Sequence, residues 1–368
     1  MSLMNCAERP DSKDIPYSLS LYANVFDFHK GSTSMFYNDK FESAGKLSKS
    51  SLMELMTAEG GRQQELFQMA RTARHEHGLD QITLRGVIEI SNHCQKSCDY
   101  CAMRCVNKGF NRYRMSSDEI LAISAEIKKA NISTVFLQSG QDPNCEPILD
   151  EVIPEIKNKL QMGVLLCIGE KSKATYQRYK DLGADSYILK FETSSEDLYQ
   201  EIAHTPLPRR LDCIRWIKEA GLKLGTGNIV GLPNQSLEIL AEDIQLALQL
   251  QPDFVSSSPF IPNENTPFEH SPLGDLNLTL NMMALWRILF KNCLIPSVSA
   301  LEKIQKGGQL MGLMAGANVI TINFTPKASR DKYSIYSMDR FVVSLDHALN
   351  IIEQAGLQIQ QPPAAVAV

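Results

Sequence analysis

Three cysteines stand within eight residues in the pattern C-x3-C-x2-C, as Cys94, Cys98 and Cys101. Cysteine thiolates in short loops hold iron-sulfur clusters, and a four-iron cluster with three protein ligands leaves one iron open for a substrate or cofactor. A fourth thiol, Cys105, follows at a further x3 spacing. Four cysteines could instead close a structural zinc site or a fully ligated cluster. The spacing alone therefore leaves a catalytic site and a closed site as alternatives.

The elements that must position these cysteines are indicated by the apolar pattern. Eight candidate strands lie at 86–90, 134–138, 163–168, 186–191, 223–229, 254–258, 296–300 and 318–323. Amphipathic helices are expected between them at 117–130, 147–160, 173–182, 209–220 and 237–248. Parallel strands need crossover helices, so the repeats predict an α/β fold, a (βα)8 barrel of the TIM type. The cysteine triplet follows the first strand, at the barrel end where such enzymes place their active sites.

Three regions are expected along the chain. Residues 1–48 are rich in Ser, Asp, Asn and Lys and form an N-terminal extension that packs on the body or is partly mobile. The barrel domain spans 49–362 and opens with helical spacing before its first strand, so the fold includes an N-terminal helical extension. Residues 363–368 form a C-terminal tail.

Composition narrows the class of protein. The chain of 368 residues is 43% hydrophobic and 21% charged, with a formal net charge of -5, which favours a globular protein and gives no reason to expect nucleic acid. We find neither an apolar run of the roughly 18–20 residues that a membrane span needs nor a signal peptide, so a cytoplasmic protein is expected. The nine cysteines are clustered, which favours metal binding over disulfides. Cys145 and Cys167 are expected to pack near the barrel mouth.

An ordered set of motifs resembles a known family. Residues 90–104 read ISNHCQKSCDYCAMR, with Tyr100 directly before the third cysteine, and RYRMS follows at 112–116. Further matching segments lie at 137–143, 189–193, 225–233, 258–262 and 315–320. Together they resemble the branch of radical S-adenosylmethionine (radical SAM) enzymes that contains biotin synthase, methylornithine synthase and the [FeFe]-hydrogenase maturase HydE. The resemblance covers about residues 50–330, and HydE and methylornithine synthase are the most similar.

The resemblance implies an oxygen-sensitive [4Fe-4S] cluster on Cys94, Cys98 and Cys101, whose open iron binds S-adenosyl-L-methionine. One electron, from a donor such as flavodoxin or ferredoxin, would cleave this cofactor to methionine and a 5'-deoxyadenosyl radical. The radical would act on a small-molecule substrate inside the barrel. The protein's part is to orient the cofactor and to exclude water and oxygen.

The matching motifs also imply residues that bind the cofactor. Those expected near its methionyl and ribose groups lie at strand ends: Gln138, Ser139, Gly140 and Glu192. Arg210 is expected to bind its carboxylate, with the neighbouring Arg209 as the alternative. Close backbone approach to the adenosyl group is expected at Gly227. The adenine is expected to contact Tyr100, Phe260 and Ile261.

Departures from the HydE pattern mark the candidate substrate residues. Lys190, on the same strand face as Glu192, replaces an arginine. Val298 and Ser299 replace a threonine pair, and Arg330 lies where the Pro-Tyr-Arg pattern of HydE is missing. Lys190, Ser299 and Arg330 are therefore expected to bind the polar groups of a small amino-acid-like or thioether metabolite.

Three other reactions or roles remain alternatives. The first two are a carbon-skeleton rearrangement, as in methylornithine synthase, and sulfur insertion, as in biotin synthase. Sulfur insertion is disfavoured because a full second set of cluster ligands is missing from the sequence. The third is a non-catalytic iron-sulfur or zinc protein that uses all four cysteines.

Overall fold

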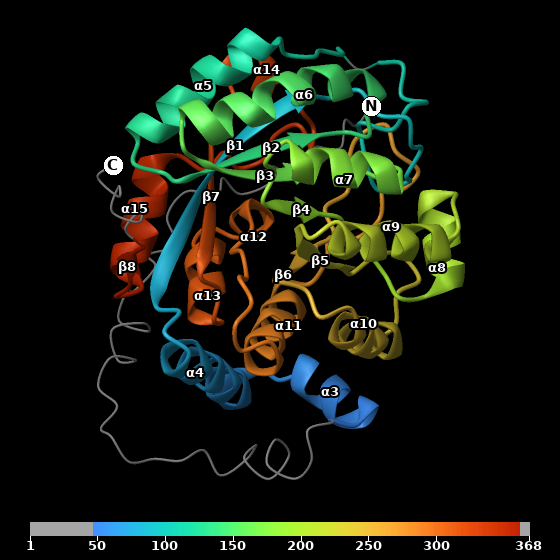
Figure 1. The fold of residues 1–368 in the computed structure, drawn as a ribbon. Helices are drawn as coiled ribbons and strands as arrows, with labels where there is room; N and C mark the ends of the chain where they lie inside the picture. Colours follow the sequence, from blue (N-terminus) through green and yellow to red (C-terminus); the bar gives the residue numbers. More distant parts are fainter. Residues whose placement is uncertain (1–46, 110, 361–368) are drawn as a thin grey trace, which may run out of the picture. The chain divides into compact units, whose positions relative to one another are not determined.

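The computed structural model describes residues 47–109 and 111–360. Its centre is a curled parallel sheet in the order β6-β5-β4-β3-β2-β1-β7, with helices on its outer side (Figure 1). The strands are β1 (Gln81–Ser91), β2 (Thr134–Ser139), β3 (Gly163–Cys167), β4 (Ser186–Ile188), β5 (Lys223–Val230), β6 (Phe254–Pro259) and β7 (Val319–Asn323). A two-residue strand, β8 (Gln358–Ile359), pairs with the start of β1.

The ring between β6 and β7 is closed by a short segment at 294–297. Leu294 forms a parallel bridge with Phe254 of β6, and Pro296 forms one with Val319 of β7. The backbone N–H of Ser297 donates to the Val319 carbonyl at 2.9 Å. The predicted (βα)8 barrel is therefore confirmed. The strand predicted at 296–300 is wrong, because Pro296 has no N–H to extend the ladder and helix α12 already begins at Ser299.

The helices between the strands follow the predicted order. They are α5 (Ser117–Lys129), α6 (Glu146–Pro154), α7 (Lys173–Asp181), α8 (Glu196–Ala203), α9 (Leu207–Glu219), α10 (Leu237–Leu250), α11 (Leu276–Leu289), α12 (Ser299–Ile304), α13 (Gly308–Met314), α14 (Lys327–Arg330) and α15 (Leu345–Gln354). A 3-10 turn, η1 (Pro143–Cys145), precedes α6. The helix predicted to run to residue 160 ends at Pro154 and continues as a π turn, η2 (Glu155–Lys159). Proline lacks the N–H that the α-helical bond requires, which accounts for the change.

Two helices precede the barrel, as the spacing from residue 50 predicts. They are α3 (Lys49–Met56) and α4 (Gly60–Glu76), and Figure 1 shows α4 beside the start of β1. The amide of buried Asn281 in α11 donates to the carbonyls of Met56 and Ala58 at 2.8 and 2.9 Å. This contact fixes the loop between α3 and α4 against the barrel helices. None of the described helices is both long and apolar enough to cross a membrane.

The barrel interior contains an apolar layer across its middle. Val87, Phe136 and Leu165 are buried there, with Cys167 and Ile188 packed against them. Polar groups lie on both sides of this layer: Glu89 follows Val87 on the same face of β1, and Arg85 precedes it. The layer therefore divides the interior into a carboxyl-end part and an amino-end part.

The predicted boundaries of the barrel domain stay predictions. The extension predicted at 1–48 lies almost wholly outside the described residues, and the tail predicted at 363–368 lies wholly outside them.

Candidate active site

The cysteine loop leaves β1 at the carboxyl end of the barrel. Cys98 is buried in an apolar cluster with Tyr199, Ile229 and Phe260, and Cys101 packs against that cluster. Burial raises the pKa of the Cys98 thiol to about 11 and raises that of Cys101 further. Cationic metal centres stabilise thiolates, so a bound cluster would offset this cost.

The arrangement of the thiols fits a cluster better than a single ion. Among the described residues, no three His, Cys, Asp or Glu side chains are grouped so that they could hold one metal ion. A zinc site requires four ligands on one ion, whereas each thiolate of a four-iron cluster binds a different iron. The side chain of Cys105 is exposed, while Cys94 contributes to the electrostatics of both Cys98 and Cys101. The three-cysteine set is therefore the better fit.

Backbone groups already point at the first thiol. The N–H groups of Lys96 and Gln141 donate to Cys94 Sγ, both at 3.4 Å. Such donors stabilise a thiolate. Gly140 allows this approach, because a Cβ there would lie 2.3 Å from the His93 carbonyl oxygen and 2.8 Å from Cys94 Cβ. The end of β2 thus needs glycine to accommodate the cysteine loop.

Arg112 fastens the far side of the loop. Its guanidinium donates to the carbonyls of Met103, Arg104 and Asn107 at 2.9, 2.8 and 3.2 Å, and also to that of Asn92. It thereby joins the end of β1 to the residues after the third cysteine. Sequence reasoning used Arg112 only as part of a motif and missed this role, because carbonyl acceptors leave no signal in a sequence.

Asn92 is a second anchor of the loop. Its buried amide donates to the carbonyls of Asn111 and Lys332 at 2.8 and 2.7 Å, and its oxygen accepts from Tyr113 N–H at 2.8 Å. The contact with Lys332 connects the loop to the chain after β7.

Lys190 and Glu192 lie together beyond the end of β4, because the strand predicted at 186–191 already ends at Ile188. Their proximity is therefore set by the loop after β4 and not by strand alternation. Lys190 Nζ lies 3.3 Å from Glu192 Oε2 and 3.5 Å from Ser258 Oγ. Glu192 has a left-handed backbone, with φ of 67°, and it is held by hydrogen bonds of its N–H to Gly227 and of its carbonyl to Ile229. A left-handed conformation is costly for a residue with a side chain, and such strain is found where a side chain must be aimed at a site.

Arg210, rather than Arg209, belongs to the site. Its Nε lies 2.9 Å from Glu170 Oε1 and donates to the Tyr199 hydroxyl at 2.7 Å. Arg209 instead stacks over the Trp216 ring. Glu170 also pairs with Lys96 of the cysteine loop at 3.1 Å, so a chain of charges joins Arg210 to the loop. Glu170 was missed in the sequence, since it follows β3 without any motif.

The residues predicted to contact the adenine, and Gly227, lie near the cysteine loop. Phe260 and Ile261 are buried at the end of β6, and the Asn263 amide donates to the carbonyls of Tyr100 and Ile261 at 3.0 and 3.1 Å. Gly227 has a φ of 151°, and a Cβ there would lie 1.9 Å from the Ser256 carbonyl oxygen. Strand packing therefore already accounts for Gly227, and its contact with a cofactor stays a prediction.

Gln138 and Ser139 end β2, next to Gly140. Gln138 is half-buried, and the Ser139 hydroxyl donates to the Gly140 carbonyl at 2.6 Å. Both therefore lie where the cysteine loop meets β2, and their binding of a cofactor stays a prediction.

The other two candidate substrate residues are less closely tied to Lys190. Ser299 begins α12 and Arg330 ends α14, and neither shares a hydrogen bond or ion pair with Lys190 in the described structure. A different arginine, Arg340, reaches the interior, where it pairs with Glu89. Sequence reasoning missed this pair, although Glu89 interrupts the apolar run of residues 86–90.

Residues 331–340 contact the same end of the barrel. The Ser337 N–H donates to Asn263 Oδ1 at 2.7 Å, and the Tyr336 hydroxyl lies 3.2 Å from Ser258 Oγ. Together with the Lys332 contact, these bonds connect the chain after β7 to the cysteine loop and to β6.

Cys145 and Cys167, the two cysteines near the barrel mouth outside the loop, have different surroundings. Cys145 is buried, and its thiol donates to Asp142 Oδ2 at 3.4 Å. Cys167 ends β3 and packs on the apolar layer. Packing near the barrel mouth, as predicted for both, agrees with these positions.

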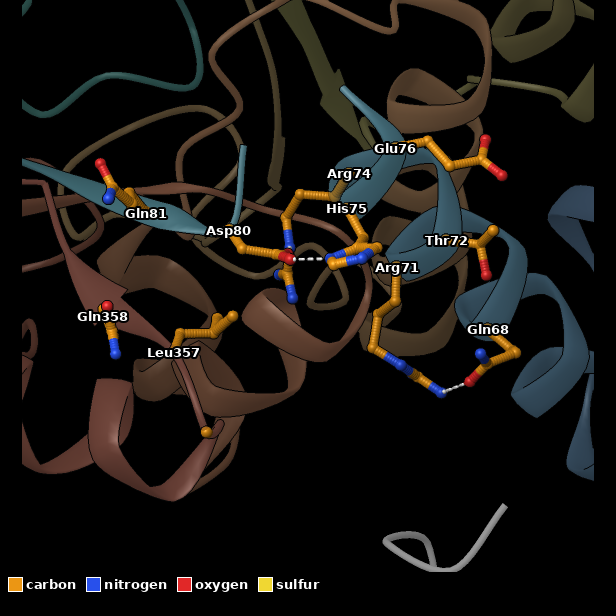
Figure 2. Close-up of a pocket in the computed structure, with 11 residues that line it drawn as sticks. Gln68, Arg71, Thr72, Arg74, His75, Glu76, Asp80, Gln81, Leu357 and Gln358 are labelled. Carbon is orange, nitrogen blue, oxygen red and sulfur yellow. Dashed lines mark hydrogen bonds and ion pairs between the residues drawn. The ribbon is translucent and has the colours of Figure 1, made fainter. Parts of the chain in front are cut away.

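A cavity of about 510 Å³ lies far from these residues along β1 (Figure 2). It lies between α4 and residues 356–358, beside the amino end of the strand. Within it, Asp80 pairs with Arg74 at 3.0 Å and with His75 at 2.6 Å. Arg71 donates to Gln68 at 2.6 Å. Since none of the predicted site residues lines it, this cavity is not the candidate active site.

Comparisons with known proteins agree with this geometry. The family model described as the radical SAM superfamily matches residues 88–247. The [FeFe] hydrogenase maturase subunit HydE of Thermotoga maritima is 37% identical over 278 residues, which cover 75% of this chain and 80% of the relative. The 3-methylornithine synthase of Methanosarcina acetivorans is 29% identical, with 77% and 82% covered. A biotin synthase of Yersinia pestis is 27% identical, with 73% and 80% covered.

Solved structures support the fold. The crystal structure of methylornithine synthase (PylB) has a TM-score of 0.77 at 24% identity, covering 86% of this chain and 94% of that one. The maturase HydG of Carboxydothermus hydrogenoformans has a TM-score of 0.72 at 21% identity, with 87% and 77% covered. At these identities the likeness concerns the barrel fold.

Proposed function

The chain belongs to the radical SAM superfamily, and from this premise we propose that it acts on a small amino-acid-like or thioether metabolite inside its barrel. Enzymes of this family use a [4Fe-4S] cluster and S-adenosyl-L-methionine, which together supply a 5'-deoxyadenosyl radical. The observation that carries the proposal is the partly buried Lys190–Glu192 pair at the carboxyl end of the barrel that also bears the three-cysteine loop.

In this proposal Cys94, Cys98 and Cys101 hold the cluster. The cofactor would be bound by side chains and strand ends around the loop, which are Tyr100, Gln138, Ser139, Gly140, Glu192, Arg210, Gly227, Phe260 and Ile261. Support comes from the charges near the loop, since Glu192 offers a carboxylate and Arg210 a guanidinium. These groups match the ammonium and carboxylate of a methionyl moiety.

The substrate is proposed to be polar and zwitterionic at one end. Lys190 would bind its carboxylate, aided by Ser258 and Tyr336, whose hydroxyl oxygens lie 3.2 Å apart. Ser299 and Arg330 remain further candidates for this task. The buried Glu89–Arg340 pair adds both signs of charge to the same part of the interior. If Glu192 binds the cofactor, an apolar metabolite would leave the Lys190 ammonium without a carboxylate partner, which is costly in a largely buried site.

We infer a small protein reductant, such as flavodoxin or ferredoxin, and a reaction in the cytoplasm, where thiols are kept reduced. No part for nucleic acid or a membrane is proposed. These points rest on the family's need for an electron and on the composition of the chain.

The deciding experiment is anaerobic. The cluster is reconstituted, dithionite and S-adenosyl-L-methionine are added, and 5'-deoxyadenosine is quantified with and without candidate amino acids and thioethers. Wild-type protein should release 5'-deoxyadenosine, and Cys98→Ala should not. Cys105→Ala is the matched control and should behave like the wild type. Loss of the cluster in Cys105→Ala would instead support the closed four-cysteine site.

Product mass separates the possible reactions. Rearrangement of a carbon skeleton leaves the mass of the substrate unchanged, whereas sulfur insertion adds that of a sulfur atom. The similarity to 3-methylornithine synthases favours rearrangement as the second candidate. Sulfur insertion is less favoured, because Cys145 and Cys167 have different surroundings. Cys145 donates a hydrogen bond to Asp142, whereas Cys167 packs on the apolar layer.

A further inference from the structure

The barrel has a second cavity, at the end opposite the cysteine loop. Its volume is about 480 Å³, and it is lined by the first residues of six strands and by residues 292–294. The apolar layer of Val87, Phe136 and Leu165 lies between this cavity and the groups around Lys190. The cavity is therefore separate from the candidate active site.

Arg85 of β1 lines this cavity and is 3% exposed. Its guanidinium lies over the Phe254 ring, 4.9 Å from the centroid. Nη2 is inaccessible to solvent and has no hydrogen-bond partner, and the described residues give Arg85 no ion pair. Burial lowers the pKa of Arg85 to about 10, and no neighbouring carboxylate opposes this effect. Buried charges are normally paired, so an unpaired guanidinium beside a cavity points to a missing partner.

The other charged groups of the cavity leave it positive. Lys157 pairs with Asp185 at 2.6 Å, and the second Asp185 oxygen accepts the Val164 N–H at 2.8 Å. Asp253 accepts the Leu224 N–H at 2.8 Å. Lys223 has no carboxylate partner within the described part of the chain. The cavity therefore holds three cations, Arg85, Lys157 and Lys223, and two carboxylates, Asp185 and Asp253, both of which already accept backbone N–H groups. Its net charge is positive.

Two hydroxyl groups complete the lining. Thr134 and Ser186 stand at the starts of β2 and β4, and their hydroxyls make no hydrogen bond within the described residues. Both can donate to a bound oxygen atom.

We propose that this amino-end cavity binds a small oxyanion, a carboxylate or a phosphate group, on Arg85, with Lys223, Thr134 and Ser186 as further donors. The planar guanidinium matches the two oxygens of either group, and the ring of Phe254 holds its plane. The cavity is large enough for the rest of a metabolite that carries such a group. This site stands independently of the radical reaction proposed above.

The test measures anion binding to reconstituted protein under anaerobic conditions. Inorganic phosphate and acetate are titrated separately at constant ionic strength set with chloride, by calorimetry and by the shift in melting temperature. Wild-type protein should bind at least one of them saturably, and Arg85→Met should weaken that binding at least tenfold. Arg215→Met is the matched control, since this arginine is exposed and does not line the cavity, and it should bind as the wild type does. Comparison of the two titrations identifies the preferred oxyanion.

A second readout separates a binding role from a structural one. Without anion, Arg85→Met should melt at the same temperature as the wild type or higher, because it removes an unpaired buried charge. A large fall in melting temperature would overturn the proposal, as would equal anion binding in wild type and Arg85→Met or no saturable binding at all. Thr134→Val, which keeps the cation, should weaken binding severalfold with an unchanged melting temperature. If Arg85→Met does not fold, unaltered binding by Thr134→Val would contradict the site.

Discussion

Glu89 and Arg340 form a buried two-pronged ion pair inside the barrel, although 251 residues separate them in the chain. Arg340 Nη2 lies 2.6 Å from Glu89 Oε2, and the second guanidinium nitrogen contacts the other oxygen. Glu89 also accepts from the Asn323 amide at 3.1 Å. The pair thus joins the chain after β7 to β1, three residues before Asn92.

Removing one member of this pair should destabilise the protein strongly. Arg340→Met leaves the Glu89 carboxylate buried without its cation, at a cost of about 3–5 kcal/mol. The double variant Glu89→Gln with Arg340→Met should lose clearly less unfolding free energy than either single variant. Urea unfolding of the reconstituted protein measures this cycle. Single variants as stable as the wild type would show that the pair is open to water.

The cysteine loop should depend on Arg112 more than on its own exposed residues. Arg112→Lys keeps the charge but cannot reach the four carbonyls that the guanidinium contacts, so the loop should loosen. We expect iron and sulfide content to fall severalfold with an unchanged far-UV circular dichroism spectrum. Arg62→Lys, at an exposed position, is the matched control and should retain the cluster. Full iron content in Arg112→Lys would show that the remaining contacts suffice.

Much of this architecture could be predicted because it is encoded locally. The cysteine triplet is contiguous, and Lys190 and Glu192 stand two residues apart within one motif. The strand positions follow from apolar runs, which the barrel buries.

The missed features depend on contacts between distant segments. Arg340 pairs with Glu89 across the fold, and Glu170 pairs with the predicted Arg210. Of these four residues, Glu89, Glu170 and Arg340 were not marked by any motif. The wrong boundaries have a different cause. Pro154 and Pro296 lack the N–H that a helix or strand needs, so the predicted helix turns into a π turn and the predicted strand is reduced to one bridge.

Gly140 should be intolerant of any side chain. The Cβ of Gly140→Ala would lie 2.3 Å from the His93 carbonyl oxygen, so the cysteine loop or β2 must move. We expect loss of most of the cluster, measured by its visible absorption and iron content. Gly61→Ala is the control, because its Cβ would meet open space in α4, and it should stabilise the helix by up to about 1 kcal/mol. Normal cluster loading in Gly140→Ala would contradict the close packing of the loop on β2.

The stability of the protein should carry a pH dependence from Asp243 of α10. This buried carboxyl accepts hydrogen bonds from the Ser194 N–H at 2.6 Å and from the Asn228 amide at 2.7 Å. Asn228 in turn bridges to Glu192, so the network supports the left-handed residue of the site. Burial raises the pKa of Asp243 to about 6, and the two hydrogen bonds only partly oppose this rise.

The sign of the effect follows from proton binding. The folded chain holds this proton more tightly than the unfolded chain. The contribution of Asp243 to the free energy of unfolding is therefore fully present below about pH 4 and is lost as the pH rises through about 6. Asp243→Asn cannot ionise and should remove this loss. Between pH 5.5 and 7.5 the wild type should therefore lose on the order of 1 kcal/mol more unfolding free energy than the variant does. Anaerobic urea unfolding at the two pH values measures this, with the exposed-site variant Asp212→Asn as control. An equal pH dependence in wild type and Asp243→Asn would mean that Asp243 is ionised without cost in the folded protein.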